Sequence, residues 1–375
     1  MAIEELRIDG YRSLRRLRIP LQPITVVTGP NGSGKSNLYR ALVLIAQSAQ
    51  GRFARALAEE GGLSSAMWAG QRFTREKTRV VLGLTTDEFS FEMACGYPQG
   101  GKTLHDPGRF ALDPEIKLEQ VWGGRQRRPS ALLCERRNSM IRIRGGDYEW
   151  NDYPFTVTPT ESVLSQLREP YRYPELWRLR ESVLRWRFYH QFRTDSRSPL
   201  RQWQVATYSP ILDDDGENLA SALATIQLSE LSEALARAVH QAFGANLVIA
   251  SEDTLRNPAS RTLTRAEIRL ETPSLGRALT ARELSDGTLR FLCLAAALLS
   301  DRPPELLALN EPETSLHPDL IPVLAGMIVD ASRSSQVWVT THSALLAERI
   351  AELSGCRPIR LEMVDGETRI IDGDA

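Results

Sequence analysis

Residues 26–37 read Val26-Val27-Thr28-Gly29-Pro30-Asn31-Gly32-Ser33-Gly34-Lys35-Ser36-Asn37 and fit the pattern G-x-x-x-x-G-K-[ST] at every fixed position. The apolar run 24–27 predicts a strand before the loop, and helical spacing of apolar residues over 38–45 predicts a helix after it. A strand, a loop and a helix in this order are the context in which the pattern binds phosphate. The alternative is a chance Gly-rich turn before a helix, and the complete match disfavours it.

The residue types in this loop suit a nucleoside triphosphate. Glycines let the backbone bend so that successive N–H groups face phosphate oxygens, and the helix adds its positive N-terminal end. We expect Lys35 to reach the β- and γ-phosphates and the Ser36 hydroxyl to ligate Mg²⁺. The predicted ATP-binding residues of the loop are Gly29, Pro30, Asn31, Gly32, Ser33, Gly34, Lys35, Ser36 and Asn37.

The composition is that of an ordinary globular protein. The chain has 375 residues, 25% of them charged, and a net charge of −1, so any contact with nucleic acid requires a local basic patch. Its four scattered cysteines indicate a reducing compartment and no zinc site. The N-terminus lacks the apolar core of a signal peptide, and the longest apolar run, 291–299, is too short to span a bilayer. We therefore expect a cytoplasmic protein without a membrane segment.

Hydrophobic periodicity divides the chain into an α/β part and a helical part. Residues 1–150 and 245–375 alternate strands with helices, whereas 151–244 carry apolar residues mainly at helical spacing, interrupted by prolines. We expect a mixed sheet flanked by helices, an antiparallel β subdomain and a helical lobe over 151–244. The predicted strands are 3–8, 14–19, 24–27, 79–84, 89–95, 140–143, 246–250, 266–271, 306–309, 336–340 and a hairpin over 359–371; the predicted helices are 36–57, 162–167, 175–186, 218–243 and 291–299.

A second motif covers Leu306-Leu307-Ala308-Leu309-Asn310-Glu311-Pro312-Glu313. An apolar strand that ends in a polar pair is typical of a Walker B segment, where an acid usually holds Mg²⁺ through water and a Glu activates the attacking water. Asn310 stands where the first acid is usual, so we expect weaker Mg²⁺ binding from a neutral amide. Glu311 is the candidate catalytic base. The alternative is a polar strand end without a catalytic role.

A third motif, Glu283-Leu284-Ser285-Asp286-Gly287-Thr288, precedes an apolar helix about twenty-five residues before Asn310. It is similar to the signature loop of ABC-type ATPases, which binds the γ-phosphate of the partner subunit's ATP. The candidate residues are Ser285, Asp286 and Gly287. A simple helix cap is the alternative, and we expect Asp286, which replaces a glycine, to cap the helix.

A fourth motif places His342 at the end of the apolar strand 336–340, about thirty residues beyond Glu311. A single His is more often structural, but this spacing resembles that of the switch histidine that contacts the γ-phosphate in the same class. The sequence offers no clear Q-loop glutamine, and Gln47 and Gln120 are weak candidates.

Together the four motifs resemble the RecF/SMC-like branch of the ABC ATPases, and most closely the RecF-like ATPases that lack coiled coils. The opening Tyr11-Arg12-Ser13-Leu14 looks like the F-[RK]-[SN]-[FL] start of that branch, which implies that Arg12 contributes to ATP binding. The pattern Glu-Pro-Glu-x-x-Leu-His-Pro over 311–318 is similar to its Walker B and D-loop. The chain departs from the branch in lacking a coiled coil, and the 33 residues after His342 (375 minus 342) are too few for the nuclease domain that OLD-type proteins append.

The resemblance implies an ATPase with ATP and Mg²⁺ as its ligands, and the neutral Asn310 predicts that its hydrolysis is slow. Two copies are expected to close head-to-tail over two ATP molecules and to act on DNA, in repair or in defence against foreign DNA. A nucleotide-dependent switch that binds an unidentified protein partner with little hydrolysis is the alternative, and Asn310 favours it. A transporter ATPase is disfavoured by the long helical insert and by Glu313.

Arginines and aromatic residues are interleaved in two segments, 125–144 and 168–201. This composition suits phosphate contact and base stacking. The alternative is that the aromatic residues form a core and the arginines an ion-paired surface. The candidate DNA contacts are Arg185, Arg187 and Arg193.

Overall fold

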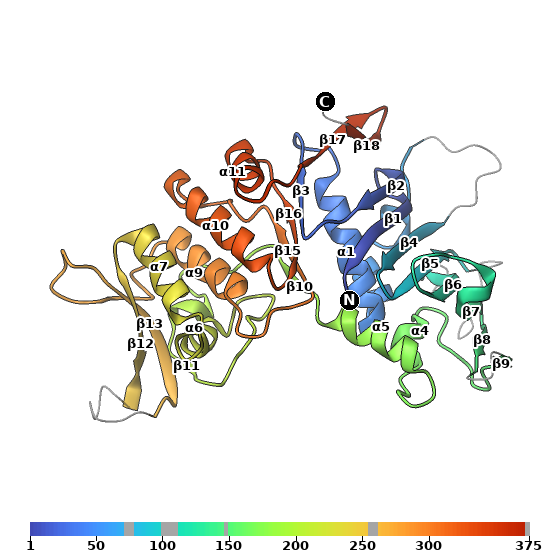
Figure 1. The fold of residues 1–375 in the computed structure, drawn as a ribbon, viewed down its shortest axis with the longest axis horizontal. Coiled ribbons are helices and arrows are strands. Elements are labelled where there is room, and N and C mark those ends of the chain that lie inside the picture. Colours follow the sequence, from blue (N-terminus) through green and yellow to red (C-terminus); the bar gives the residue numbers. More distant parts are fainter. Residues whose placement is uncertain (71–78, 99–111, 146–148, 254–261, 372–375) are drawn as a thin grey trace. The chain divides into compact units, whose positions relative to one another are not determined.

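The computed structural model describes residues 1–70, 79–98, 112–145, 149–253 and 262–371 (Figure 1). The chain forms two compact units. The first contains Met1–Gln22, Gly29–Trp186 and Ile359–Ala375, and the second contains Pro23–Thr28 and Arg187–Pro358. The expected helical lobe, 151–244, is divided between them, because its first helices pack on the helix after the phosphate loop and a later segment joins the parallel sheet of the second unit.

An antiparallel sheet forms most of the first unit. Its strand order is β2-β1-β4-β5-β6-β7-β8-β9. The strands are β1 (Ile3–Tyr11), β2 (Leu14–Pro20), β4 (Val80–Thr86), β5 (Phe89–Gly96), β6 (Glu115–Gly123), β7 (Leu132–Arg137), β8 (Met140–Arg144) and β9 (Trp150–Asp152). This sheet is the antiparallel subdomain that the sequence predicted. The hairpin of β17 (Ile359–Val364) and β18 (Glu367–Ile371) belongs to the other large sheet.

The sequence Asp9-Gly10 predicts a turn between the expected strands 3–8 and 14–19, but the first hairpin turns three residues later. Tyr11 pairs with Leu14, so Arg12 and Ser13 form the turn between β1 and β2. The prediction of a turn at Asp9-Gly10 is wrong because Gly10 meets a different requirement. A Cβ on Gly10 would lie 2.3 Å from the carbonyl oxygen of Arg79, so glycine permits this close backbone approach.

The helices of the first unit pack around α1 (Lys35–Gln50), whose apolar residues Leu38, Leu42 and Ile45 are fully buried. The expected helix over 36–57 is broken at Gly51, which ends α1 in the left-handed conformation at φ 77°. The helices that follow are α2 (Phe53–Glu59), α3 (Leu63–Ala66), α4 (Val163–Gln166) and α5 (Pro174–Leu184). Because α2, α4 and α5 all contact α1, the helix that begins at the phosphate loop is the centre of this layer.

A parallel sheet in the order β10-β15-β16-β3 organises the second unit. Its strands are β10 (Arg187–Tyr189), β15 (Leu306–Asn310), β16 (Gln336–Thr340) and β3 (Ile24–Thr28). All five residues of β15 are buried, as expected for a parallel strand covered on both faces. The carboxyl ends of these strands meet at one edge, which is where open α/β sheets bind ligands.

Helices and a smaller antiparallel sheet complete the second unit (Figure 1). The predicted buried helix is confirmed as part of α9, but the expected helix over 218–243 is interrupted near Leu228 and forms two helices. The helices are α6 (Leu219–Gln227), α7 (Ser232–Phe243), α9 (Asp286–Leu298), α10 (Ile321–Ala331) and α11 (Ala344–Ser354), and the strands are β11 (Gln204–Val205), β12 (Asn246–Ser251), β13 (Arg265–Glu271) and β14 (Leu279–Thr280).

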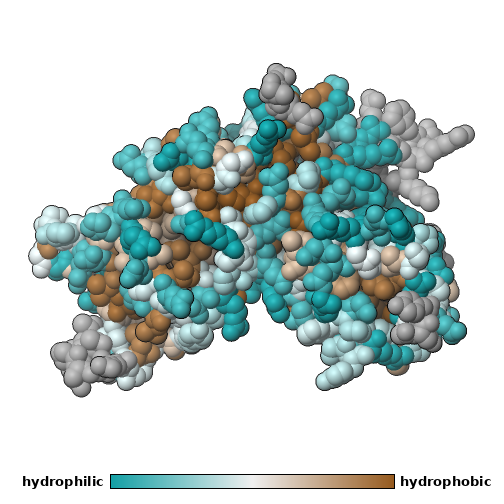
Figure 2. Space-filling model, in the orientation of Figure 1, coloured by the Kyte–Doolittle hydropathy of each residue, from teal (hydrophilic) through white to brown (hydrophobic). Residues whose placement is uncertain are grey.

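Most of the surface drawn in Figure 2 is hydrophilic, with hydrophobic residues showing between the polar ones. None of the helices in the described ranges is both long and apolar enough to cross a membrane. The predicted fold class, a mixed sheet flanked by helices with an antiparallel β subdomain, is confirmed.

Candidate functional site

The phosphate-binding loop runs from Gly29, directly after β3, to the first residue of α1. Gly29, Gly32 and Gly34 all have positive φ, which other residues adopt at a cost in free energy. A Cβ would lie 2.4 Å from the carbonyl oxygen of Leu361 at Gly29, and 2.1 Å from Thr368 Oγ1 at Gly34. Glycine is therefore required at both ends of the loop.

The ammonium group of Lys35 lies against the backbone of this loop. Its Nζ donates to the carbonyl oxygens of Gly29 (2.7 Å) and Pro30 (3.0 Å), and the residue is 5% exposed. The buried Ser33 Oγ has no hydrogen-bond partner in the part of the chain that the structure describes. Ser36, in contrast, is exposed at the start of α1. A held cation, a buried hydroxyl group without a partner and a bent glycine backbone fit a polyphosphate.

Two other predicted ATP-binding residues, Asn37 and Arg12, have protein partners. Asn37 Nδ2 donates to Ser13 Oγ at 2.8 Å, which ties the start of α1 to the β1–β2 turn. Arg12, at φ 49°, pairs with Glu60 at 2.8 Å. Burial lowers the pKa of Arg12, but the hydrogen bonds and charges of Glu60 and Tyr11 together outweigh this, and the net change is upward. Both residues thus brace the loop's surroundings in this structure.

In the second unit, Asn310 ends β15 in a buried hydrogen-bond network. Its Oδ1 accepts from Thr340 Oγ1 at 2.5 Å, and its Nδ2 lies 2.6 Å from His190 Nδ1. His190 is adjacent because Tyr189 of β10 is in register with Leu309 of β15. The amide oxygen of Asn310 retains a second lone pair. The residue therefore fits a Mg²⁺ ion that is held through a water molecule, although it is neutral.

Glu311 leaves the strand in a strained conformation. Its φ is 49°, and its N–H donates to the Thr340 carbonyl at 2.8 Å. Its own carbonyl accepts from Arg290 Nη2 at 3.2 Å. Burial lowers the pKa of Arg290. Because the backbone turns here, the Glu311 carboxylate is one-third exposed rather than buried in the sheet.

Glu313 connects the same loop to His342. Its Oε1 accepts from Thr341 Oγ1 (2.5 Å), from the backbone N–H of His342 (3.1 Å) and from that of Ser343 (3.2 Å). It also lies 3.3 Å from His342 Nδ1, whereas Glu311 Oε1 lies 3.9 Å from that atom. The buried Oε2 of Glu313 has no hydrogen-bond partner among the described residues. One carboxylate thus fixes the position of the predicted switch histidine.

The signature segment begins α9, and the expectation that Asp286 caps this helix is wrong. Ser285 is the N-cap, because its Oγ accepts from the N–H of Thr288 at 3.1 Å. Asp286 instead pairs with Arg201 at 2.6 Å. A Cβ on Gly287 would lie 2.8 Å from the carbonyl oxygen of Ser315, so the loop after the Walker B strand approaches the signature closely.

Arg201 holds the signature segment from one side. Besides Asp286, its guanidinium donates to the carbonyl oxygens of Ala281 (3.0 Å), Arg282 (3.2 Å) and Leu284 (2.7 Å). The residue is 8% exposed. A buried arginine with this many carbonyl partners fixes the backbone that leads to Ser285.

Sequence reasoning missed the polar residues that follow β10, His190 and Gln191. A strand of three residues is too short for a periodicity signal. Gln191 is exposed after a strand of the parallel sheet, whereas Gln47 belongs to α1 and Gln120 donates to Glu135 within the antiparallel sheet. Gln191 therefore occupies a better position for a glutamine at the nucleotide than either of the residues proposed from the sequence.

The three arginines that the sequence predicts as DNA contacts do not belong to one unit of the fold. Arg185 ends α5 in the first unit, whereas Arg187 and Arg193 belong to the second, where Arg193 pairs with Asp195 at 2.7 Å. The aromatic residues Trp186, Tyr189 and Phe192 are buried. Base stacking on these three side chains is therefore excluded, because they form part of the core.

The arginines of the other basic segment are mostly paired. Arg137 and Arg142 both contact Glu135, Arg127 contacts Glu92, and Arg136 is fully buried against backbone carbonyls. This segment fits the alternative of an ion-paired surface better than that of a free phosphate-binding patch.

Family models match two parts of the chain. A family model described as "AAA domain, putative AbiEii toxin, Type IV TA system" matches residues 160–348, just over half of the chain, and a model described as "AAA ATPase domain" matches residues 1–89. The OLD nuclease of Thermus scotoductus (strain ATCC 700910 / SA-01) is 37% identical over 43 residues, which are 12% of this chain and 8% of that protein.

Solved structures of SMC heads share the fold. An Smc head bound to the C-winged helix domain of ScpA has a TM-score of 0.52 at 15% identity, covering 99% of this chain and 98% of that one. The Smc head with an extended coiled coil, bound to the C-terminal domain of ScpA from Pyrococcus furiosus, has a TM-score of 0.51 at 14% identity, covering 99% and 96%. With the family model spanning just over half of its residues, the chain belongs to the AAA-domain family that this model describes, and it shares the fold of the SMC heads.

Proposed function

We propose that the chain binds ATP with Mg²⁺, hydrolyses it slowly, and closes with a second copy head-to-tail over two nucleotides. In this form it engages DNA or a DNA-processing partner, in repair or in defence against foreign DNA. The observation that carries the proposal is the phosphate-binding loop, in which three glycines have positive φ and the Lys35 ammonium lies against the loop carbonyls.

The bound nucleotide would supply the phosphoryl group, and Mg²⁺, when bound, would neutralise the charge of its phosphates. Lys35 exchanges its carbonyl partners for phosphate oxygens, while Ser36 and Asn310 hold the metal, Asn310 through water. Glu311, which is partly exposed beyond β15, orients and deprotonates the attacking water. His342, fixed by Glu313, contacts the γ-phosphate.

Slow hydrolysis follows from the neutral Asn310. An amide orients a metal-bound water but lacks the attraction that a carboxylate exerts on Mg²⁺. The hydrogen bonds to His190 and Thr340 hold the amide in one orientation. Asn310 would therefore orient a metal-bound water but attract Mg²⁺ weakly.

The signature segment supports the dimer. Ser285 at the N-terminus of α9 offers a hydroxyl and the positive end of a helix to the nucleotide of the other copy, while Gly287 permits the close approach of the Ser315 carbonyl beside it. Asp286 is turned to Arg201, so its negative charge is neutralised at this surface.

The proposed role on DNA and in defence comes from two of the comparisons. It rests on the short match to a protein named OLD nuclease and on the toxin–antitoxin wording of the family description. The four cysteines are free, which suits the reducing cytoplasm. The second candidate, a protein-binding switch with little hydrolysis, is favoured by Asn310 and by the SMC heads that were solved with ScpA bound.

The test combines turnover with assembly. Light scattering is carried out on the wild type and on Glu311→Gln with and without ATP·Mg²⁺, beside measurements of ATP hydrolysis. We expect a monomer without nucleotide, and a dimer when Glu311→Gln blocks turnover. Adding Ser285→Arg to Glu311→Gln should abolish the dimer without loss of ATP binding, because it places bulk at the shared phosphate.

An unchanged mass in every state would contradict the head-to-tail dimer. If the dimer forms but wild-type hydrolysis cannot be distinguished from that of Glu311→Gln, the protein-binding switch is the better description.

A further inference from the structure

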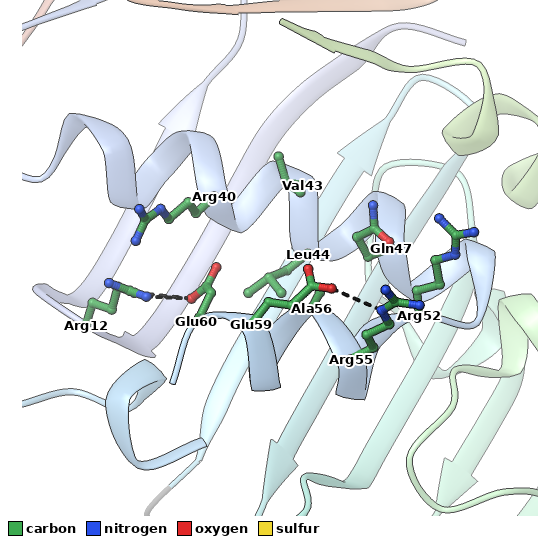
Figure 3. A pocket seen from close by; sticks show the side chains of 10 residues that line it. All are labelled: Arg12, Arg40, Val43, Leu44, Gln47, Arg52, Arg55, Ala56, Glu59 and Glu60. Atoms are coloured by element: carbon green, nitrogen blue, oxygen red, sulfur yellow. Dashed lines mark hydrogen bonds and ion pairs between the residues drawn. The ribbon is translucent and has the colours of Figure 1, made fainter. Parts of the chain in front are cut away.

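A polar groove lies between α1 and α2 of the first unit, on the helix that begins at the phosphate-binding loop (Figure 3). We call it the α1–α2 groove; the residues that concern us are Arg12, Arg40, Leu44, Gln47, Arg52 and Arg55. Its volume is about 560 Å³. Arg40 and Gln47 are two turns apart on α1, so both side chains line the same side of the helix.

The groove exists because α1 stops at Gly51. Gly51 adopts a left-handed conformation, and the N–H of Arg52 donates to the Gln47 carbonyl at 2.8 Å. The chain therefore reverses and α2 lies against α1. This reversal places Arg52 and Arg55 near Gln47, at the opposite end of the groove from Arg40 and Arg12 (Figure 3).

Charge in the groove is unbalanced. Its two carboxylates are already occupied, since Glu60 pairs with Arg12 at 2.8 Å and Glu59 with Arg55 at 3.0 Å. Within the described ranges, no hydrogen-bond or ion-pair partner contacts the guanidinium group of Arg40 or of Arg52. Both residues are exposed. The groove thus has one arginine without a protein partner toward each end.

The spacing of these arginines indicates the size of the ligand. Arg40 and Gln47 are seven residues apart, which is about 10 Å along a helix. This exceeds one phosphate group, and a nucleic-acid strand rises about 3.4 Å per nucleotide in a duplex. Between the two ends, the half-buried Val43 offers an apolar contact beside the buried Leu44. A chain of phosphates with less polar groups between them matches this pattern.

We propose that the α1–α2 groove binds a ligand with more than one phosphate group, with Arg40 and Arg52 as its main contacts. The ligand is a single nucleic-acid strand or a small polyphosphate. The identification of the ligand as a nucleic acid rests on the proposed function. The inference that the groove binds phosphate groups rests only on the residues that line it. Arg12 at one end also allows the ligand to compete with Glu60 for its guanidinium group.

Binding of a fluorescent single-stranded oligonucleotide, measured by anisotropy across a salt series, tests the proposal. The double variant Arg40→Glu/Arg52→Glu should bind at least about tenfold more weakly. Its log–log salt slope should be smaller by about 1.4, since each lost phosphate contact on a single strand removes about 0.7. Arg40→Gln/Arg52→Gln should show the same direction with a smaller loss.

The control is Arg128→Glu, which makes, at one exposed arginine of the first unit outside the groove, the charge reversal that the double variant makes at each of its two positions. It should bind the oligonucleotide like the wild type. Unchanged melting temperatures and ATP affinity for all variants exclude misfolding and separate this test from that of the nucleotide site. Competition with tripolyphosphate and with polyglutamate distinguishes the ligand sources.

If tripolyphosphate binds and is lost in the double variant while the oligonucleotide does not bind, the groove is a small-polyphosphate site. The proposal is overturned if the double variant binds both phosphate ligands like the wild type, if the wild type binds neither, or if polyglutamate binds at least as tightly as they do. If the wild type binds ATP and DNA and the double variant binds both equally well, the groove is not a phosphate-binding site, and the proposed function still stands.

Discussion

The phosphate-binding loop and the carboxyl edge of the parallel sheet hold their functional side chains in different ways. The loop depends on its own backbone: Gly29 and Gly34 permit the bend, and Lys35 donates to carbonyls five and six residues away. The sheet edge depends on side chains from distant parts of the sequence, of which Asn310, Glu313 and Thr341 are buried. Asn310 contacts His190, which is 120 residues away, and Glu313 contacts Thr341, which is 28 residues away.

This difference determines how each region responds to substitution. A loop formed by local backbone geometry keeps its shape when one side chain is shortened, so only ligand binding is lost. In a buried network, every polar group depends on its partner, and removal of one partner leaves others unsatisfied. Substitutions in the loop should therefore weaken ligand binding without loss of stability. Substitutions at the sheet edge should lower both activity and stability.

The largest effect is expected for Lys35→Ala. The ammonium supplies charge-assisted hydrogen bonds to phosphate, so its loss should weaken ATP binding by at least about 100-fold, or about 3 kcal/mol. Calorimetry measures the affinity, and the melting temperature without nucleotide should change by no more than about 2 °C. An unchanged ATP affinity would show that the loop does not bind the nucleotide.

At the sheet edge we expect Glu313→Ala to lower both stability and turnover. The hydroxyl of Thr341 and the N–H groups of His342 and Ser343 would lose their acceptor, at a cost of about 1–3 kcal/mol. We expect the kcat for ATP to fall by about 30-fold with little change in KM, because His342 loses its orientation. Glu313→Gln retains an acceptor oxygen and should recover most of the melting temperature. Equal kcat values for Glu313→Ala and wild type would exclude a positioning role.

The sequence alone predicts elements and residues correctly where the signal is a short motif or a regular spacing of apolar residues. The loop glycines, Lys35, the buried strand β15 and the strand before His342 all follow from short patterns, and the structure contains each of them. The breaks in helices were missed because a glycine such as Gly51 can also be tolerated inside a helix. Local pattern does not show whether such a residue ends the helix, since tertiary packing decides it.

The partners of the functional residues could not be predicted for a different reason. His190 lies beside Asn310 only because β10 joins the parallel sheet, and Arg201 reaches Asp286 across 85 residues. The sequence pattern also could not separate buried aromatic residues from exposed ones among the arginines of 168–201. Trp186 and Phe192 fill the core, whereas Tyr171 is fully exposed.

A smaller effect is expected from Asn310→Asp. A carboxylate near a metal-bound water adds attraction of about 1 kcal/mol, so the Mg²⁺ concentration for half-maximal ATPase activity should fall about fivefold. The new oxygen would face His190 Nδ1 in place of the amide nitrogen and requires a proton on that atom. ATPase rates against Mg²⁺ for both proteins measure the change. Superimposable curves would mean that residue 310 does not face the metal.

The smallest effect is expected at Glu283, whose contacts are local, like those of the phosphate loop, but exposed. Its carboxylate accepts from the N–H and hydroxyl of Thr280 and from Arg277. The hydrogen bond from Arg277, followed by those from Thr280, lowers the pKa of Glu283 from 4.5 to about 2. Since the native-state pKa lies below the unfolded value, the stabilisation is complete above about pH 4.5 and is lost as the pH falls toward 2.

We therefore expect Glu283→Gln to lower the melting temperature at pH 7 by less than about 2 °C, because solvent screens the pair. The difference from wild type should be the same at pH 6 and smaller at pH 4. Glu348→Gln, at an exposed position of α11, is the matched control and should show no difference at either pH. A deficit in Glu283→Gln that grows on acidification would show that the carboxylate is not stabilised in its ionised form, and that local exposed contacts do not support the signature segment.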